Sequence, residues 1–554
     1  MNKISILRLP RHKVLMAIRD SGLTLASLSA LFATVHPAQA LNLYDGANNG
    51  NNLEINLTTT VSYTGQYRVN SPSAVLMGNS TVNDGDANFQ HGLVGNLFSA
   101  VPVLDIRDGD YGAHFSGQLY LNTSYLGTNQ NDLSPWSSAL YVPKQNDFTS
   151  GTRNVDGQNA QLLDAFVFGQ HAFEDGQTLQ LKVGRQVLFW GQSLFFPTDG
   201  ISGGQAPINI VSAQNIINPQ AQQVFMPVGQ AVVTYEPMPG TTFQAYYQFE
   251  WEHDFFQGEG AYFNSLNLIY AGGTTAILAP GLAAERVKDV DPEHQNGQFG
   301  LSYQQEISAW DLGIYGERFD AKAPEIGLDE GPGAGTALPH GFTQVGTYGL
   351  YYSRDIWLEG VSFSTNVGPA NVAGELSFRQ HQPLFPANGF FVAVDNTGNA
   401  SSDPLYPVGN TWDAQLSSIY VSPGIPLDPG GVSFAGEIIL NHLINVTKNR
   451  AALAPGSQAT AGAFDFSITP TYNDVLPKLQ ITFPIGLTYN YLGRSAVDPA
   501  LYHGTGTFDI GVTGTYDVNW AASLAYQDYL GRPNTVYNGL ADRGYVSLNL
   551  QHTF

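Results

Sequence analysis

The chain has 554 residues, no cysteine and a formal net charge of −23 at pH 7, and only 12% of its residues are charged. The absence of cysteine excludes disulfides, thiol nucleophiles and cysteine-ligated metal centres, and we expect no cofactor. The acidic balance repels phosphate backbones and excludes nucleic acid as a partner. Soluble domains carry about twice this charged fraction, whereas the lipid-facing positions of a membrane β-barrel must be uncharged.

Residues 1–40 have the pattern of a secretory signal peptide. The segment begins with a basic region that contains Lys3, Arg8, Arg11 and Lys13, continues into an apolar stretch from Leu23 to Val35, and ends with Ala38-Gln-Ala40. This order predicts export and cleavage after Ala40. Because the apolar stretch is too short to stay in a bilayer as a helix, we expect one mature unit, residues 41–554.

After residue 40, segments of about ten residues alternate between apolar and polar side chains. Residues 53–58 read Leu-Glu-Ile-Asn-Leu-Thr, and residues 508–513 read Phe-Asp-Ile-Gly-Val-Thr. This period of two predicts β-strands with one apolar face. No later stretch reaches eighteen consecutive apolar residues, so helices are not expected to span a membrane. A closed barrel is the other structure that satisfies every backbone group in lipid.

The predicted strands are joined alternately by short turns and by long connections, as in barrels with periplasmic turns and extracellular loops. The alternation predicts an all-β, transmembrane antiparallel barrel of eighteen strands, with sixteen as the main competitor. The expected strands are 53–68, 92–107, 111–126, 161–171, 178–189, 228–236, 241–252, 297–307, 309–319, 350–367, 370–380, 411–421, 431–442, 463–472, 478–491, 506–517, 519–529 and 544–554. An even number places both ends of the barrel domain on the periplasmic side. The least regular segments are 92–107 and the start of 350–367.

One long connection differs from the others in composition. Of the fifty residues between Arg185 and Glu236, only Asp199 is charged, and the central part lacks strand alternation. Exposed loops are usually polar. We therefore expect residues 190–227, here called the insert, to fold into the mouth or lumen of the barrel. The alternative is an extracellular loop that packs on its neighbours and has no part in transport.

Four short motifs resemble those of a Gram-negative outer-membrane β-barrel family catalogued as a domain of unknown function. They are Gly184-Arg-Gln-Val-Leu-Phe-Trp-Gly191, Ile217-Asn-Pro219, Tyr247-Gln-Phe-Glu-Trp251 and Asp355-Ile-Trp-Leu-Glu-Gly-Val-Ser-Phe363. The resemblance covers most of the mature chain. Family members often lie near genes for degrading steroids, terpenes or aromatics, which implies transport of hydrophobic compounds. The family carries basic residues after the Asn-Pro, whereas residues 220–224 are neutral here, so binding of an anionic substrate is not carried over.

The same region supplies the candidate residues of the substrate path. Apolar aromatic side chains offer a track for a hydrophobic ligand, although burial within the insert explains them equally well. Arg185 is expected to pair with Glu250 or Glu252, either as an anchor of the insert or as a substrate contact. The full set of candidates is Arg185, Trp190, Phe195, Phe196, Phe225 and Trp251. Trp251, with Trp310, has the alternative of lying in an interfacial girdle.

The last strand, 544–554, ends on an aromatic residue. Val546, Leu548, Leu550 and Phe554 share one parity, and polar residues occupy the other. This is the pattern of a lipid-facing strand. We expect Phe554 to serve as the signal for the barrel-assembly machinery.

These features predict an outer-membrane channel for hydrophobic or amphipathic small molecules. Its expected partners are outer-membrane lipids, lipopolysaccharide and a small hydrophobic solute. The sequence contains no nucleophile elbow, no zinc-protease motif, no Walker A motif and no dinucleotide-binding motif. We therefore do not expect the chain to be an enzyme. A diffusion porin for polar solutes is the main alternative, followed by a barrel enzyme and an adhesin. Acidic runs such as 83–86 and 289–293 offer oxygen ligands for Ca²⁺, but solvation explains them better.

Overall fold

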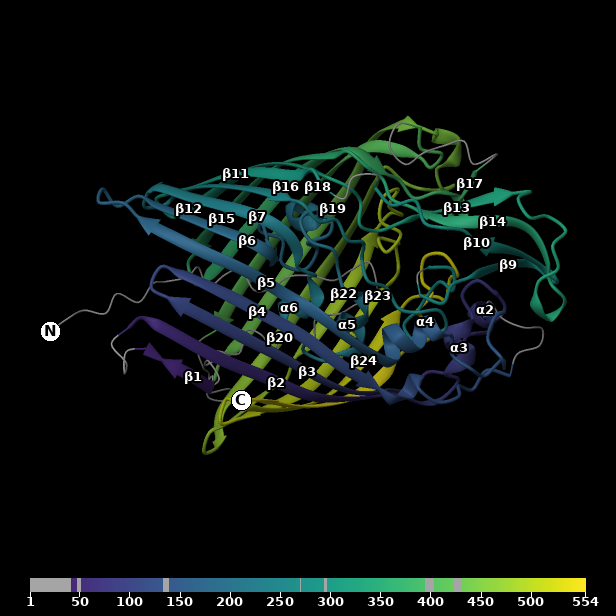
Figure 1. Ribbon diagram of the computed structural model, residues 1–554, viewed down its shortest axis with the longest axis horizontal. Coiled ribbons are helices and arrows are strands. Elements are labelled where there is room, and N and C mark those ends of the chain that lie inside the picture. The colour runs from purple at the N-terminus through teal and green to yellow at the C-terminus, as the bar shows by residue number, and fades with distance from the viewer. Residues whose placement is uncertain are drawn as a thin grey trace.

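The computed structural model describes residues 41–46, 51–132, 139–269, 271–292, 296–393, 403–422 and 430–554. The predicted signal peptide lies outside the described residues. Long antiparallel strands form a tilted barrel, with β1 and the carboxyl terminus at one end and an additional sheet beyond the other end (Figure 1). The barrel strands are β2 (Leu53–Arg68), β3 (Gly92–Asp108), β4 (Tyr111–Asn122), β5 (Gln158–Ala172), β6 (Thr178–Gln186), β7 (Val228–Met238), β8 (Thr241–Gln248), β11 (Gln298–Ile307), β12 (Trp310–Phe319), β15 (Ile356–Val367), β16 (Ala370–Pro383), β18 (Val408–Ser422), β19 (Val432–Lys448), β20 (Thr460–Leu476), β21 (Leu479–Thr482), β22 (Ile485–Leu492), β23 (Gly506–Tyr516), β24 (Trp520–Leu530) and β25 (Tyr545–Thr553).

The barrel closes between its first and last strands. β25 pairs antiparallel with β2 from Thr60↔Thr553 to Arg68↔Tyr545. β21 and β22 are two parts of one barrel strand, because both pair with β20 and with β23. The ring therefore has eighteen strands, which confirms the predicted number.

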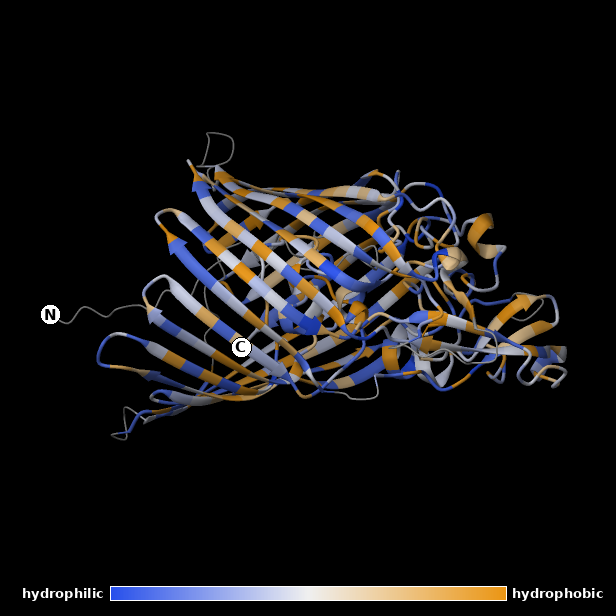
Figure 2. Cartoon of the chain, turned by 90° about the horizontal axis from the view of Figure 1, so that it is seen from above, coloured by the Kyte–Doolittle hydropathy of each residue, from blue (hydrophilic) through white to orange (hydrophobic). Residues whose placement is uncertain are grey.

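The alternation along each strand separates an apolar outer face from a polar inner face. On β25, Leu548 and Leu550 are 45% and 47% exposed, whereas Ser547 and Asn549 are 2% and 1% exposed. Figure 2 shows the same alternation of hydrophobic and hydrophilic residues along the other barrel strands. An apolar outside and a polar inside are the arrangement of a transmembrane barrel.

Most predicted strands match the structure within a few residues, and 92–107 is correct. The prediction 350–367 is wrong at its start, because the barrel strand begins at Ile356 and Tyr351 ends a strand of the additional sheet. The prediction 478–491 is interrupted at residues 483–484. Pro484 has no backbone N–H to donate to a neighbouring strand, which accounts for the break.

The barrel ladder also contains one strand that the alternation did not reveal. β1 (Leu41–Asp45) pairs antiparallel with the part of β2 that extends beyond β25, from Leu41↔Leu57 to Asp45↔Glu54. It therefore covers a strand edge that would otherwise be free.

Helical segments are short and lie in the connections. They are α2 (Ala74–Met77), α3 (Asp84–Asn88), η3 (Thr123–Tyr125), α4 (Ser150–Thr152), η4 (Arg153–Gly157), η5 (Ile201–Gly204), α5 (Ile210–Asn215), α6 (Ala221–Val224), η6 (Pro339–Gly341), η7 (Ala387–Gly389) and η8 (Arg450–Ala452). Across the described ranges, none of the helices has the length and apolar character needed to cross a membrane.

A second sheet of five strands lies beyond the end of the barrel that carries the long connections (Figure 1). Its order is β17-β13-β14-β10-β9, and its strands come from three different long connections. They are β9 (Thr275–Ala279), β10 (Leu282–Arg286), β13 (Glu325–Glu330), β14 (Thr343–Tyr351) and β17 (Phe391–Ala393). We call this the loop sheet. Its strands lie in segments that the sequence pattern assigned to loops or, for 350–351, to a barrel strand.

Candidate functional site

The insert crosses the inside of the barrel and is hydrogen-bonded to opposite walls. Figure 1 shows its helices α5 and α6 within the outline of the barrel. On one side, Gln66 of β2 donates to the carbonyl of Gln214 at 3.0 Å, and Gln118 of β4 donates to the Ser212 hydroxyl at 3.1 Å. On the other side, Gln415 of β18 donates to the carbonyl of Phe196 at 2.9 Å. The insert is thus folded into the lumen, as predicted.

Two buried glutamates hold the first half of the insert. Glu375 of β16 accepts the backbone N–H groups of Gln192, Ser193 and Ile201, at 2.9 Å for Ser193 and 2.7 Å for Ile201. Gly191 has a positive φ of 84°, and a side chain there would collide with the Glu375 carboxylate. This explains why glycine occupies the last position of the first resembling motif.

The second glutamate, Glu437 of β19, accepts the next consecutive N–H groups of the same segment. Leu194 donates to it at 3.0 Å and Phe196 at 3.1 Å, and Phe195 donates as well. The insert lacks a strand partner here, so its backbone donors need side-chain acceptors. Neither glutamate could be identified from sequence, because a single inward-facing Glu in a barrel strand looks like any other polar lumen residue.

The aromatic candidates of the insert are buried where the insert meets the wall. Trp190 is 1% exposed, donates to Gln244 at 2.5 Å and packs against Tyr246, with ring centroids 5.1 Å apart. Phe195 and Phe196 pack in a cluster with small and aliphatic wall residues that include Ala435 and Ile439. Phe225 packs against other insert residues, including Ile208 and Ile210, and lies edge-on to Phe189, just before the insert, with ring centroids 4.2 Å apart.

The two remaining candidates lie nearer the barrel mouth. Arg185 forms an ion pair with Glu250, one of the two partners predicted for it, and its second guanidinium nitrogen donates to the carbonyl of Pro227 at 3.0 Å. This pair ties the last strand before the insert to the residue where the insert ends. Trp251 is buried beneath the loop sheet against Tyr352 at 4.9 Å. The girdle alternative for Trp251 is therefore wrong, whereas Trp310 is 48% exposed on the barrel.

A cavity of about 1100 Å³ lies between the insert and the loop sheet. Its roof is apolar and comes from the loop sheet and the connections beside it. Its floor is formed by the insert. Representative roof residues are Leu268, Ile277, Ile326, Leu328 and Tyr348, and representative floor residues are Asp199, Ala206, Ile208 and Ile210. None of the six candidate residues from the sequence lines this cavity.

Charged side chains in the cavity wall hold the insert from above. Lys322 donates to the carbonyl of Gly204 at 2.7 Å, and Asp254 accepts the N–H of Ile208 at 2.8 Å. Arg379 donates to the carbonyls of Thr198 and Gly200. Burial raises the pKa of Asp254 to about 6 and lowers the pKa of the Lys322 ammonium to about 8.

This arrangement has the chemical character of a binding site. The cavity joins a large apolar surface to a few fixed polar groups, which is typical of sites for small apolar ligands. Within the residues that the structure describes, no group of three or more histidine and acidic side chains is placed to hold a metal ion.

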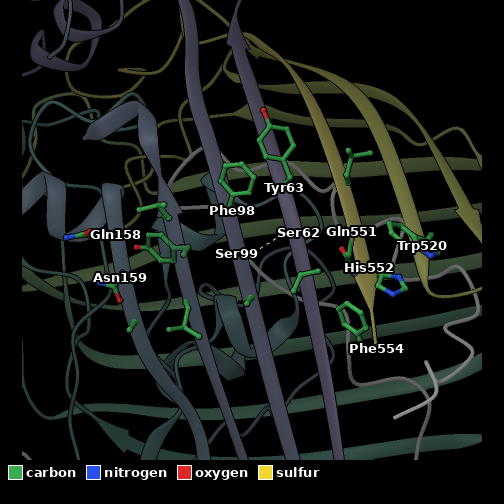
Figure 3. Close-up of a pocket in the computed structure, with 17 residues that line it drawn as sticks. Ser62, Tyr63, Phe98, Ser99, Gln158, Asn159, Trp520, Gln551, His552 and Phe554 are labelled. Carbon is green, nitrogen blue, oxygen red and sulfur yellow. Dashed lines mark hydrogen bonds between the residues drawn. The ribbon is translucent and has the colours of Figure 1, made fainter. Parts of the chain in front are cut away.

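A second, shallower concavity of about 900 Å³ lies on the outer face of the barrel, over β2 to β5, β24 and β25. Figure 3 shows Tyr63 and Phe98 side by side on neighbouring strands, and Trp520 near His552 and Phe554. Phe554 is 54% exposed. Its ring therefore lies on the lipid-facing side, as predicted from parity.

Comparison with solved structures found porins with little sequence similarity. A BenF-like porin from Pseudomonas fluorescens Pf-5 has a TM-score of 0.43 and 8% identity, covering 91% of this chain and 98% of that chain. Acinetobacter baumannii OccAB3 has a TM-score of 0.42 and 8% identity, covering 90% and 99%. Pseudomonas aeruginosa OpdK, solved with vanillate, has a TM-score of 0.41 and 8% identity, covering 90% and 98%.

Comparison with curated proteins gave no match. Comparison with protein families matched residues 21–554 to a single described family, which covers the insert, the barrel and the loop sheet. The chain belongs to the family described as protein of unknown function DUF1302.

Proposed function

We propose that the protein is a Gram-negative outer-membrane channel for small hydrophobic or amphipathic molecules, with the cavity above the insert as its outer binding site. The observation that carries the proposal is the position of this cavity: it lies at the mouth of a transmembrane barrel, and its floor is the segment that crosses the lumen. An apolar solute that leaves the outer leaflet or its polar layer gains a dry surface there.

The insert has two roles in this proposal. It narrows the lumen, and its apolar residues continue from the cavity floor to the barrel wall. Burying apolar surface stabilises a ligand by about 25 cal/mol per Å². A solute can therefore move along the insert by exchanging one apolar contact for another, which a wide water-filled pore does not offer. Trp190, Phe195, Phe196 and Phe225 would act here by holding the insert in the shape that forms this path.

Export and location are part of the same proposal. We infer cleavage after Ala40, which would make Leu41, the first residue of β1, the amino terminus of the mature protein. Outer-membrane lipids and lipopolysaccharide would surround the apolar belt. The barrel-assembly machinery would recognise the last strand with Phe554.

The test compares uptake by Gram-negative cells with and without the protein. We expect faster uptake of a terpene- or sterol-sized neutral compound and unchanged uptake of a sugar of similar mass. In planar bilayers the intact protein should conduct small ions poorly. Deleting residues 200–222 should raise that conductance, because it removes most of the segment that crosses the lumen.

A heat-dependent gel shift would establish that the deletion variant still forms a barrel. Faster sugar uptake and high conductance in the intact protein would instead favour a diffusion porin for polar solutes. Unchanged uptake of every compound would overturn the channel proposal.

A further inference from the structure

One carboxyl group in the cavity wall differs from its charged neighbours. Glu325 is the first residue of β13, and its Cα partner on β14 is Tyr351. It lines the cavity together with Ile326, which is 5% exposed. A carboxyl group is thus placed at the edge of an otherwise apolar roof.

The other charged side chains of this wall are engaged by the protein. Asp254, Lys322 and Arg379 each bond to the backbone of the insert or its ends. Asp498 accepts the N–H of Ala500 at 2.8 Å. By contrast, in the part of the chain that the structure describes, the Glu325 carboxyl makes neither a hydrogen bond nor an ion pair. Its oxygens remain open to the cavity, as its partial burial and its place in the lining show.

The protonation of Glu325 follows from its surroundings. Burial raises its pKa to about 8, with no other cause of comparable size. Tyr351 of β14 lies opposite it in the sheet, and Tyr406 lies near enough for the Glu325 charge to help raise the tyrosine pKa. Both tyrosines are neutral near pH 7. The other acidic and basic groups that line the cavity are Asp199, Asp254, Lys322, Arg379 and Asp498. At neutral pH the carboxyl is therefore mostly protonated, and a protonated carboxyl offers one O–H donor.

Building on the proposed function, we propose that Glu325 is a specificity-determining residue of the channel: its carboxyl O–H donates a hydrogen bond to a neutral oxygen acceptor, such as a ketone or ester carbonyl, on an otherwise apolar ligand. A hydrocarbon of the same shape would leave this donor without a partner, which lowers its affinity. An anionic ligand would gain no ion pair here. The site thus favours neutral, carbonyl-bearing hydrophobic compounds over hydrocarbons of the same shape.

The test uses two ligands with one carbon skeleton, camphor and camphane, which differ by one carbonyl group. Binding to the full mature protein in amphipol is measured by calorimetry at a pH about 1.5 units below and about 1.5 units above the Glu325 pKa of about 8. We expect the wild type to prefer camphor by about tenfold at the lower pH, the effect of one hydrogen bond. The preference should shrink at the higher pH, where the donor is lost.

Two substitutions separate hydrogen bonding from packing. Glu325→Gln keeps a donor that does not titrate, so it should retain the camphor preference at both pH values. Glu325→Leu should bind the two ligands equally and bind camphane at least as well as the wild type does. Glu330→Leu, at the exposed far end of the same strand, is the matched control and should behave like the wild type.

The outcomes distinguish this inference from the proposed function. If both ligands bind but Glu325→Leu keeps the wild-type preference, the role of Glu325 is overturned and the cavity remains a hydrophobic site. Loss of the preference in Glu325→Gln would also overturn it. If neither ligand binds the wild type, this inference fails together with the proposed binding site, and uptake assays then decide the channel function separately.

Discussion

The backbone N–H of Phe196 in the insert donates to the carboxylate of Glu437 on β19 at 3.1 Å, across 241 positions of sequence. This bond fixes one edge of the insert to the barrel wall. The same carboxylate accepts the N–H groups of Leu194 and Phe195, so one side chain satisfies three consecutive donors. A buried backbone donor that loses its acceptor costs about 1 to 3 kcal/mol.

The first prediction concerns this anchor. Glu437→Leu should release residues 194–196 from the wall and raise the ion conductance of the reconstituted barrel. Glu437→Gln should have a smaller effect, because its carbonyl oxygen still accepts. Glu306→Gln, at an exposed strand end, is the control. Equal conductance in all three proteins would show that Glu437 does not hold the insert closed.

The second prediction concerns the aromatic contacts of the insert. Trp190→Ala combined with Phe196→Ala should slow uptake of a terpene- or sterol-sized compound, because the insert loses the packing that shapes it. Each truncation of a buried aromatic side chain costs about 3 to 5 kcal/mol, which should lower the temperature of the heat-dependent gel shift. Trp310→Ala, on the outer face, removes similar area without touching the insert. Uptake at the parental rate in the double variant would contradict the role given to these residues.

The third prediction is a pH dependence at Asp254. Burial raises its pKa from 3.8 to about 6, so between these values the folded state binds more protons than the unfolded state. The free energy of unfolding that this site contributes therefore increases as the pH falls through about 6, and it levels off below 3.8. The total gain is roughly 3 kcal/mol.

This pH dependence is measured by comparing the wild type with the Asp254→Asn variant. Thermal unfolding of wild type and Asp254→Asn in detergent should show that the variant lacks this part of the pH dependence. Lys322 and His253 are the charged neighbours that influence Asp254, so the comparison is made at constant ionic strength. Parallel pH profiles of the two proteins would be inconsistent with a buried, titrating Asp254.

The fourth prediction concerns Phe554. Its N–H donates to the carbonyl of Thr59 at 3.0 Å, and its ring is exposed to the lipid side. Deleting it should lower the amount of protein in the outer membrane and increase periplasmic degradation. Phe554→Trp keeps an aromatic ring and should assemble normally. The amount of protein in each membrane fraction is measured by immunoblotting. If the deletion leaves the amount in the outer membrane unchanged, Phe554 is not part of the assembly signal.

The fifth prediction concerns a buried charge cluster that joins the end of β2 to two connections at the barrel mouth. Asp86 of α3 accepts from Arg68 and Arg543, both at 2.8 Å, and all three side chains are fully buried. Asp86→Ala would leave two buried cations without this partner, which costs about 3 to 5 kcal/mol. We expect faster cleavage of the mouth by an external protease. Glu330→Ala, which is exposed, should have no such effect.

The barrel was predictable because each strand must present alternate residues to lipid and to the lumen. This period of two can be recognised within each short segment of the sequence. The position of the insert was predictable from its missing charges. The loop sheet was not, because its strands pair only after three separate connections meet in space. Glu375, Glu437 and Glu325 are isolated acidic residues in strands. The roles of the first two arise from neighbours more than a hundred residues away, and the role proposed for Glu325 arises from a cavity that the folded connections form.

The connectivity of the loop sheet determines how the cavity can open. β17 pairs with β13 and β10 pairs with β14, so three connections share one hydrogen-bonded ladder. None of the three connections can lift away without breaking strand pairing that it shares with another, and the connection that carries β13 and β14 is paired with both of the others. The roof therefore moves as one cooperative unit, and opening it is a collective event of the kind that takes microseconds to milliseconds, slower than the rearrangement of a single side chain. For a solute that binds beneath the loop sheet, the shape of this roof is therefore set by all three connections together.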